Sequence, residues 1–414
     1  MYYNVFYYRS FNIRFLYCSS FIVVYGICMW SLGYITSSSL ETQPTIMTLS
    51  KTIDNKYPFI SKAIQQRLLI LGQKYVHLNI SQFTSTSMKT KTLTYLCESH
   101  CGGWGDRLRG ITSVYILAIL TNRHFMINMN YPCDLKNFLQ PNIYDWTWKP
   151  SKNLNRKKLY LDTLRNKYRD DLYFNISKRN FIQHWSEYDD IFLTTNSDYI
   201  TPALNNSYLS DIIVKLNIKQ SDSNQKNLFS FIFEILFRPT FKITNIVDDI
   251  LKLLYLSNST MICFHIRIGK NPTIPSDTLL YNRSSIVKDM INFVDKNILN
   301  SNINNLIFVT GDSKTSISEI LHHYPKSSIT VTGPIVHIDR FDKSINNDNI
   351  CHGFSKVIAE FYLLGECNTS LLSYSGFSAW ANRRRTDEFK NLYLYCRGVK
   401  KVTGPTWRRP HTIC

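Results

Sequence analysis

Short apolar runs and amphipathic stretches alternate regularly from residue 260 toward the end of the 414-residue chain. The runs have the length of strands, and the stretches between them have helical spacing. This alternation predicts a doubly wound α/β domain whose parallel sheet binds its ligand at the carboxyl ends of the strands. The predicted strands and helices, in turn, are Met261–Ile266, Ser284–Leu299, Leu306–Thr310, Lys314–His323, Ile329–Val331, His352–Leu364, Ser370–Ser373, Gly376 to about Arg385, and a closing strand Leu392–Cys396.

A βαβ unit precedes this domain. Thr92–Cys97 alternates as a strand, Asp106–Thr121 has one apolar helical face, and Phe125–Met129 is the next strand. The turn Glu98–Gly105 between the first strand and the helix contains three glycines. A second parallel sheet is therefore expected.

The N-terminus predicts a membrane anchor. Phe15–Ile35 contains no charged residue, and Arg9 and Arg14 precede it. The segment is long enough to cross a bilayer as a helix, and its basic flank predicts a cytoplasmic N-terminus and a lumenal body. We expect a single-pass type II protein of the Golgi or endoplasmic reticulum membrane. A cleaved signal peptide is the alternative, because Ser19 and Ser20 dilute the apolarity.

The region between the two α/β patterns is irregular, with helical stretches expected near Leu204–Leu216 and Leu228–Leu236. Arg238-Pro239 is the expected domain border, because a proline disfavours helix at the residue before it. A helix is also expected near Ile60–Tyr75, within a Ser- and Thr-rich spacer. The predicted parts are a tail (1–14), a signal anchor (15–35), a stem (36–90) and two Rossmann-like domains (91–238 and 239–414).

Cysteine usage agrees with a lumenal body. Eight cysteines follow the anchor, an even number that permits four disulfides without revealing their pairing. Cys97 and Cys101 are spaced like half of a metal site, but no cluster supplies the other ligands, so a disulfide is preferred. Sequons that predict a glycoprotein occur at Asn79, Asn175, Asn205, Asn258, Asn282 and Asn368.

The formal net charge of +18 favours an anionic partner: nucleic acid, a lipid surface, a phosphorylated donor or an acidic glycan. Lys and Arg are scattered, with tight runs at Arg383–Arg385 and Arg408-Arg409. No recognition helix, zinc finger or aromatic nucleic-acid motif accompanies them, so we expect no nucleic-acid partner.

Two cationic side chains end the strand at the centre of the second α/β pattern. His265 and Arg267 are two residues apart, so they share one face, while Phe264 and Ile266 face the other way. A guanidinium at a strand end can bind a diphosphate bidentately. The chain contains no Asp-x-Asp, the pair with which metal-dependent glycosyltransferases chelate Mn²⁺ or Mg²⁺. We therefore predict no metal site. A structural ion pair at Arg267 is the alternative.

Three turns supply further candidates. Asp312 follows a strand and precedes a helix, where it can accept hydrogen bonds from a nucleoside or cap the helix. Ser373–Trp380 opens a helix with hydroxyls and free backbone N–H groups, which suits an anion. In the glycine-rich turn, Gly103 and Gly105 let a ligand approach the backbone. Asp106 is either a general base for an acceptor hydroxyl or only a helix cap.

These motifs resemble those of the GDP-fucose-dependent fucosyltransferase superfamily with the GT-B fold, which includes α1,6-, protein O- and plant-type enzymes. Phe264–Gly269 is similar to the His-x-Arg motif of that superfamily. Gly103–Ile111 with Leu120–Arg123 is similar to its N-terminal turn and helix. Val309–Asp312 and Ser375–Ser378 are similar to its second and third donor motifs.

The resemblance implies two Rossmann-like domains, an acceptor side (91–238) and a donor-binding side (239–414). It also implies an inverting, metal-independent transfer of fucose from GDP-fucose to a glycan or protein hydroxyl, with no cofactor. Arg267 would stabilise the departing β-phosphate, and His265 would orient the donor. Asp312 would contact the nucleoside, while the phosphate pocket would contain Ser375, Gly376, Phe377 and Ser378.

Departures from the superfamily keep other functions open. Asp106 stands where several members have an amide, which leaves the base unassigned. A lumenal sulfotransferase is one alternative, with Arg107 and Arg109 near its phosphosulfate loop. An inactive carbohydrate-binding protein of the secretory pathway is another, although Arg267 is present.

Overall fold

The computed structural model describes residues 58–85, 90–219, 225–274, 276–277, 280, 285–299, 303–342 and 344–404. The predicted tail and signal anchor, and the first part of the predicted stem, lie outside these residues. Within the described ranges, no helix has the length and apolarity needed to cross a membrane.

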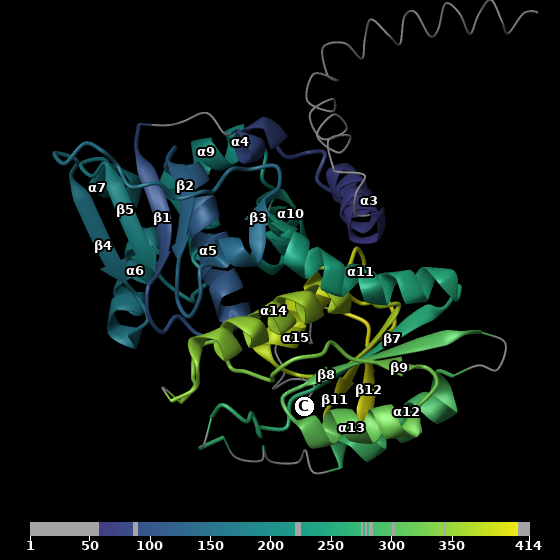
Figure 1. Ribbon diagram of the computed structural model, residues 1–414. Helices are drawn as coiled ribbons and strands as arrows, with labels where there is room; N and C mark the ends of the chain where they lie inside the picture. The colour runs from purple at the N-terminus through teal and green to yellow at the C-terminus, as the bar shows by residue number, and fades with distance from the viewer. Residues whose placement is uncertain are drawn as a thin grey trace, which may run out of the picture. The chain divides into compact units, whose positions relative to one another are not determined.

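The first sheet has the strand order β2-β1-β5-β4, and all its pairs are parallel (Figure 1). The helix α5 (Trp104–Leu120) connects β1 to β2, which confirms the predicted βαβ unit. The sequence pattern did not reveal β4 and β5. For β4 the reason is that it is an edge strand, whose residues alternate between exposed and half-buried and so form no apolar run. The strands are β1 (Thr92–Cys97), β2 (His124–Met129), β4 (Lys158–Asp162) and β5 (Asp190–Thr194).

The second sheet has the order β12-β11-β10-β7-β8-β9, and its strands from β7 to β11 alternate with helices as the sequence predicted. Its strands are β7 (Thr260–Ile266), β8 (Asn305–Gly311), β9 (Ser328–Ile329), β10 (Thr369–Ser373), β11 (Leu392–Tyr395) and β12 (Val399–Val402). The connecting helices are α12 (Ile286–Asn297), α13 (Lys314–His323), α14 (Asn347–Leu364) and α15 (Gly376–Arg383).

The edge of this sheet corrects one prediction. The expected closing strand is followed by β12, which pairs antiparallel with β11. Cys396, Arg397 and Gly398 connect the two strands, and Arg397 and Gly398 have φ values of 53° and 110°. Positive φ at both positions is what a tight hairpin turn requires.

The central strand β7 is buried on both faces, as parallel strands between helix layers are. Phe264, Ile266 and Ile268 belong to the core that also holds Met290 of α12 and Ile320 of α13. The alternation therefore turns His265 away from this core, toward the helices α14 and α15 on the other face (Figure 1).

The segment 58–84, expected to be part of a stem, instead packs on the folded body. The helix expected near Ile60–Tyr75 is confirmed as α3, and it contacts α10 and α11. Ile64 and Leu71 are buried in this contact.

The elements not yet given bounds are α3 (Pro58–Lys74), α4 (Ile80–Thr84), η1 (Leu135–Asn137), β3 (Leu139–Pro141), α6 (Asn166–Lys178), α7 (Phe181–Trp185), α8 (Ile200–Leu204), η2 (Ser207–Leu209), α9 (Ser210–Lys215), α10 (Gln225–Leu236), β6 (Phe237–Pro239) and α11 (Phe241–Leu256).

Disulfides connect the cysteines that follow the predicted anchor. One closes the start of the glycine-rich turn, one ties the loop after β2 to α14, and one ties β7 to the segment before β10. The pairs are Cys97–Cys101, Cys133–Cys351 and Cys263–Cys367, and Cys396 is also disulfide-bonded. Disulfides persist in oxidising compartments, so they support a place in the secretory pathway.

Candidate functional site

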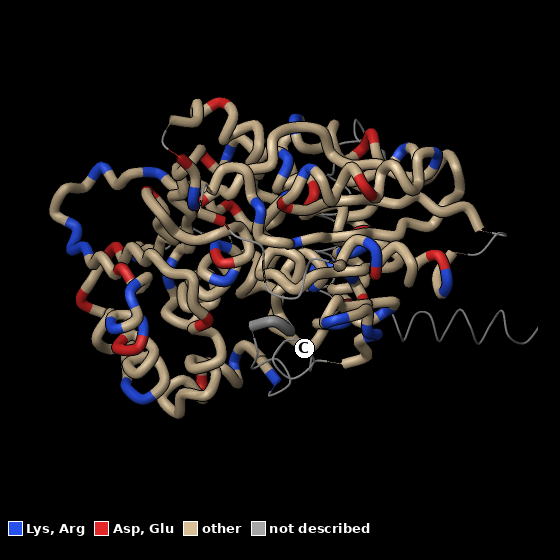
Figure 2. The backbone as a smooth tube through the Cα atoms, turned by 90° about the horizontal axis from the view of Figure 1, so that it is seen from below, with Lys and Arg blue, Asp and Glu red and all other residues tan. Residues whose placement is uncertain are grey.

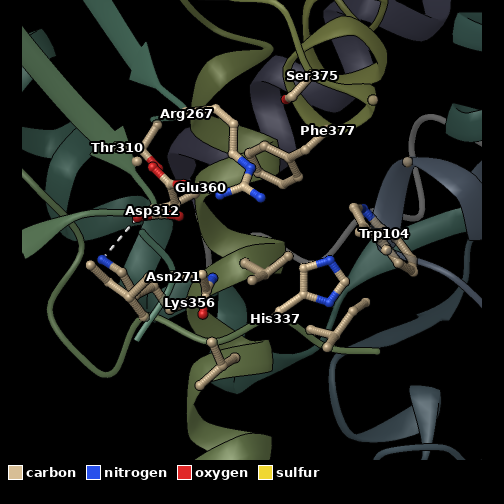
Figure 3. Close-up of a pocket in the computed structure, with 18 of the residues that line it drawn as sticks. Trp104, Arg267, Asn271, Thr310, Asp312, His337, Lys356, Glu360, Ser375 and Phe377 are labelled. Atoms are coloured by element: carbon tan, nitrogen blue, oxygen red, sulfur yellow. Dashed lines mark hydrogen bonds and ion pairs between the residues drawn. The ribbon is translucent and has the colours of Figure 1, made fainter. Parts of the chain in front are cut away.

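A cavity of ≈ 240 Å³ lies at the carboxyl ends of β7 and β8, where the N-termini of α5 and α15 also meet (Figure 3). Along the described backbone, basic and acidic residues are spread over the whole length rather than gathered in one segment (Figure 2). The cavity brings together nine of the ten residues singled out from the sequence: Gly103, Gly105, Asp106, His265, Arg267, Asp312, Ser375, Gly376 and Phe377. Ser378, the tenth, is buried behind it.

The Arg267 guanidinium is held between two carboxylates at the end of β7. Its Nη1 lies 2.9 Å from Asp277 Oδ2 and also forms an ion pair with Asp312. Burial alone would lower the pKa of Arg267, but the two carboxylates outweigh burial and raise it. The side chain is 26% exposed and borders the cavity, so a fixed positive charge faces the space where a ligand fits.

The Asp312 carboxylate organises the loop that follows β7. Its oxygens accept hydrogen bonds from the backbone N–H of Ile268 at 2.8 Å and of Gly269 at 2.7 Å, in addition to the Arg267 ion pair. The helix cap that the sequence offered as its alternative role belongs to Ser313, whose hydroxyl accepts from the N–H of Ser316. Asp312 thus positions Arg267 and the strand end together.

The N-terminus of α15 faces the cavity. Ser375 is its N-cap and forms a reciprocal capping box with Ser378, as a serine-rich helix start predicts. The cap satisfies the N–H of Ser378, while the N–H groups of Gly376 and Phe377, in the first turn, have no partner within the helix. A ligand with negative charge is stabilised at such an end. The Phe377 ring lies against His265, with ring centres 5.5 Å apart.

The glycine-rich turn is tied to the second half of the chain. Asp339 Oδ1 accepts from the N–H groups of Cys101 at 2.7 Å and Gly102 at 2.8 Å. The fully buried Arg107 donates to the Gly102 carbonyl and to the Ile338 carbonyl. Arg107 therefore holds this turn in place, a structural role that its place in the motif did not reveal.

Gly105 permits a close approach of two helices. A Cβ at this position would lie 2.5 Å from the carbonyl oxygen of Gly376, so only glycine lets the starts of α5 and α15 meet. Asp106 lies in the first turn of α5, where the helix dipole favours an acid, and the N-cap itself is Gly103. The Asp106 side chain is 41% exposed, lies 3.4 Å from Arg109 and borders the cavity.

A buried ion pair borders another side of the cavity. Lys356 Nζ lies 2.8 Å from Glu360 Oε1, and both side chains are almost fully buried. Burial raises the pKa of Glu360 against the opposing charge of Lys356 and a hydrogen bond from Thr310. The sequence analysis missed both residues, because the spacing of α14 shows them only as polar positions on a helix.

His337 also borders the cavity, and the sequence analysis missed it as well. Its Nδ1 accepts from the N–H groups of Asp339 at 3.2 Å and Arg340 at 3.0 Å, so the ring hydrogen resides on Nε2 in the neutral form. Burial, and then the charge of Arg340, lower the pKa of His337 to about 4. His337 is therefore neutral at physiological pH. The His337 and Arg267 side chains point toward the same space from two sides (Figure 3).

No protein-family model matches the chain, and no curated protein matches its sequence. Among solved structures, a mutant of FUT1 from Arabidopsis thaliana in complex with GDP superposes with a TM-score of 0.52 at 15% identity, covering 85% of this chain and 79% of that chain. NodZ alpha-1,6-fucosyltransferase soaked with GDP-fucose gives 0.48 at 13% identity, and fucosyltransferase NodZ from Bradyrhizobium gives 0.47 at 12%. Both cover 76% of this chain and 100% of NodZ. The likeness to FUT1 confirms the predicted resemblance at the level of the fold, a two-domain, GT-B-like α/β fold of fucosyltransferases.

Proposed function

We propose that this protein transfers fucose from GDP-fucose to a hydroxyl of a glycan or protein acceptor, with inversion and without a metal ion. The observation that carries the proposal is the Arg267 guanidinium, fixed at a strand end beside the N-terminus of α15, in a cavity of a fold that FUT1 shares. Both groups suit a nucleoside diphosphate.

In the proposed reaction the acceptor oxygen attacks C1 of fucose as the bond from C1 to the β-phosphate oxygen breaks. The acceptor proton passes to a base, and GDP departs with the bonding electrons. Arg267 and the N–H groups of Gly376 and Phe377 stabilise the negative charge that develops on the diphosphate. His265 and Ser375 border the same space and orient the donor, and Asp312 acts by positioning Arg267.

The neutral tautomer of His337 limits its role. Protonation at Nδ1 would displace two backbone N–H donors, so Nε2–H is a hydrogen-bond donor and His337 is a poor base. The hydrogen-bond donor Nε2–H on this side of the cavity suits a phosphate or sugar oxygen of the bound substrate. The almost fully buried Glu360 also borders the cavity, where its carboxylate oxygens can accept hydrogen bonds from N–H groups of a nucleobase.

Asp106 is the proposed base, because it is an exposed carboxylate at the cavity rim on the predicted acceptor side. Asp106→Asn is expected to lower turnover by ~100-fold or more, since a missing base must be replaced by water. GDP affinity should stay unchanged. If Asp106 only stabilises the start of α5, the variant loses about 1 kcal/mol or less of stability and keeps its rate. Initial rates and thermal unfolding of the same preparation distinguish the two roles.

Asp277 is expected to compete with the donor for Arg267. Burial raises the pKa of Asp277, but hydrogen bonds from Arg267 and Asn271 outweigh burial and lower it, so the carboxylate is ionised. Asp277→Asn removes a negative charge beside the diphosphate site and should tighten GDP binding several-fold. Calorimetric titration with GDP measures this, and Asp170→Asn, an exposed site on α6, controls for net charge. Weaker binding in Asp277→Asn alone would show instead that Asp277 is needed to orient Arg267.

Nucleotide specificity tests the proposal as a whole. GDP and GDP-fucose should raise the melting temperature of the full-length protein, with about 2.7 kcal/mol of added stability at a hundred times the Kd. Phosphoadenosine phosphosulfate and UDP-sugars should not. Stabilisation by the phosphosulfate would favour a sulfotransferase, and GDP-fucose binding without turnover would favour an inactive binding protein. Turnover should survive EDTA, and strict metal dependence would contradict the proposed class.

The proposed location is the Golgi or endoplasmic reticulum membrane, with residues 15–35 as a type II anchor and the catalytic body in the lumen. The disulfides support the compartment.

A further inference from the structure

A second depression, separate from the donor cavity, lies between the edge strand β4 and the helix α6. Its volume is ≈ 350 Å³, within the range of small-molecule sites. The residues that define it are Tyr160 and Asp162 of β4, and Tyr168, Asp171, Leu172 and Asn175 of α6. Asp171, Leu172 and Asn175 are three, four and seven positions after Tyr168, so the four residues share one face of the helix.

Two exposed tyrosine rings give this depression a flat, amphipathic surface. Tyr160 is 62% exposed and Tyr168 is 51% exposed. Tyr160 stacks on Phe192 of β5 with ring centres 4.7 Å apart and an angle of 8° between the planes. This stacking fixes the orientation of Tyr160, which lowers the entropy cost of packing a ligand on it.

Polar groups accompany the rings, and they are uncommitted. Across the described ranges, the Tyr160 and Tyr168 hydroxyls and the Asp171 and Asn175 side chains form no hydrogen bond or ion pair within the chain. Leu172 is buried beneath them. A ring surface bordered by carboxylate and amide groups matches a sugar, which has an apolar C–H face and a rim of hydroxyls.

The charge of the depression disfavours an anionic ligand. Asp162 and Asp171 border it, and among the described residues no Lys or Arg does, although the chain carries a net charge of +18. A sulfated or uronic-acid glycan would meet two carboxylates without a cation. A neutral glycan would not.

The sheet places this depression on the route of an acceptor. Leu161 pairs with Leu193, which pairs with Tyr95, so β4 and β1 end at the same edge of the first sheet. β1 leads directly into the turn that carries Gly103 and Asp106. Two strand spacings separate β4 from β1, roughly 10 Å. A glycan of a few residues spans that distance.

We propose that the β4–α6 depression binds a neutral oligosaccharide part of the acceptor, away from the hydroxyl that reacts. This inference rests on the proposed function, because it assumes that the rim near Asp106 is where the acceptor reacts. Tyr168 and Asp171 provide the main contacts, and Tyr160 supports the sugar ring.

The test compares binding of neutral and anionic oligosaccharides by the purified full-length protein. The probes are triacetylchitotriose, lactose and cellotetraose, with a heparin hexasaccharide as the anionic probe, in saturation-transfer NMR up to about 1 mM. At least one neutral probe should bind. Tyr168→Ala and Asp171→Asn should each weaken that binding about tenfold, the loss of a good contact. Tyr173→Ala is the matched control, because Tyr173 is 47% exposed on the same helix but outside the depression.

Several results would overturn the inference. These are no binding of any neutral probe, preference for heparin, or equal effects of Tyr168→Ala and Tyr173→Ala. Asn175 begins a sequon, so a glycan found there by mass spectrometry of the secreted protein would also overturn it. GDP-induced thermal stabilisation, measured in the same variants, should be unchanged. Its absence in the unmodified protein would reject the proposed function instead.

Discussion

Arg267→Lys is expected to lower turnover at least ~100-fold while the protein stays folded, the size of effect that follows from losing one preorganised charge contact in an active site. Lysine keeps the positive charge but presents a point charge on a flexible stem, so it cannot hold Asp312 and a diphosphate oxygen with the fixed geometry of a guanidinium. The reduction should appear in kcat, because the lost interaction matters most as charge develops on the departing GDP.

The choice of variant matters for Arg267. Alanine would leave Asp312 and Asp277 without their cation, so lost activity would be confounded with lost stability. Arg156→Lys is the matched control. Arg156 forms a bidentate pair with Asp190, at 2.7 Å for both contacts, far along the first sheet from the cavity. Near-normal turnover in Arg267→Lys would reject the role assigned to this residue.

Glu234→Ala is expected to destabilise the protein by about 3–5 kcal/mol, because it breaks a buried ionic network. Glu234 Oε1 lies 2.8 Å from Arg384 and 3.2 Å from Arg67, and Glu366 lies 2.9 Å and 2.6 Å from the same two arginines. Glu234 and Arg384 are completely buried. Removing one carboxylate leaves two cations to share the other in a low-dielectric interior.

A second glutamate provides the matched control for this stability measurement. Glu187 pairs with Lys157 at 2.5 Å, with both side chains about half exposed, and solvent screens such surface pairs so strongly that they add little stability. Urea unfolding of Glu187→Ala and Glu234→Ala should therefore give clearly different midpoints. Similar midpoints would show that the network is dispensable. Because Arg67 belongs to α3, which also buries Ile64 and Leu71, a fragment that begins after residue 75 should be less stable than Glu234→Ala.

The residues that gather at the cavity could be predicted from the sequence because their signals are local. A buried run that ends in His265-x-Arg267 reads as a central strand with a cationic end, since side-chain alternation along a strand depends only on the backbone. A serine before Gly376 predicts a capped helix start for the same reason. Parallel strands bring their carboxyl ends to one edge, which is why these separate turns meet in one cavity.

Other features depend on contacts between distant segments. The spacer-like composition around α3 hid the buried Arg67, whose partners are 167 to 317 residues later in the chain. The neutral state of His337 depends on two backbone N–H groups in its own loop and on burial that no local pattern shows. The positioning role of Asp312 depends on the hydrogen bonds that its carboxylate accepts from the N–H groups of Ile268 and Gly269, which lie more than 40 residues earlier in the chain.

The sequence by itself therefore determined the α/β class, the positions of most strands and the residues that converge on the cavity, because hydrophobic periodicity and turn chemistry act over a few residues. The tertiary structure alone decided which charges are paired, which polar groups are neutral and where the second depression lies. Those properties depend on desolvation and on partners brought together by folding, and neither is encoded within a short stretch of chain.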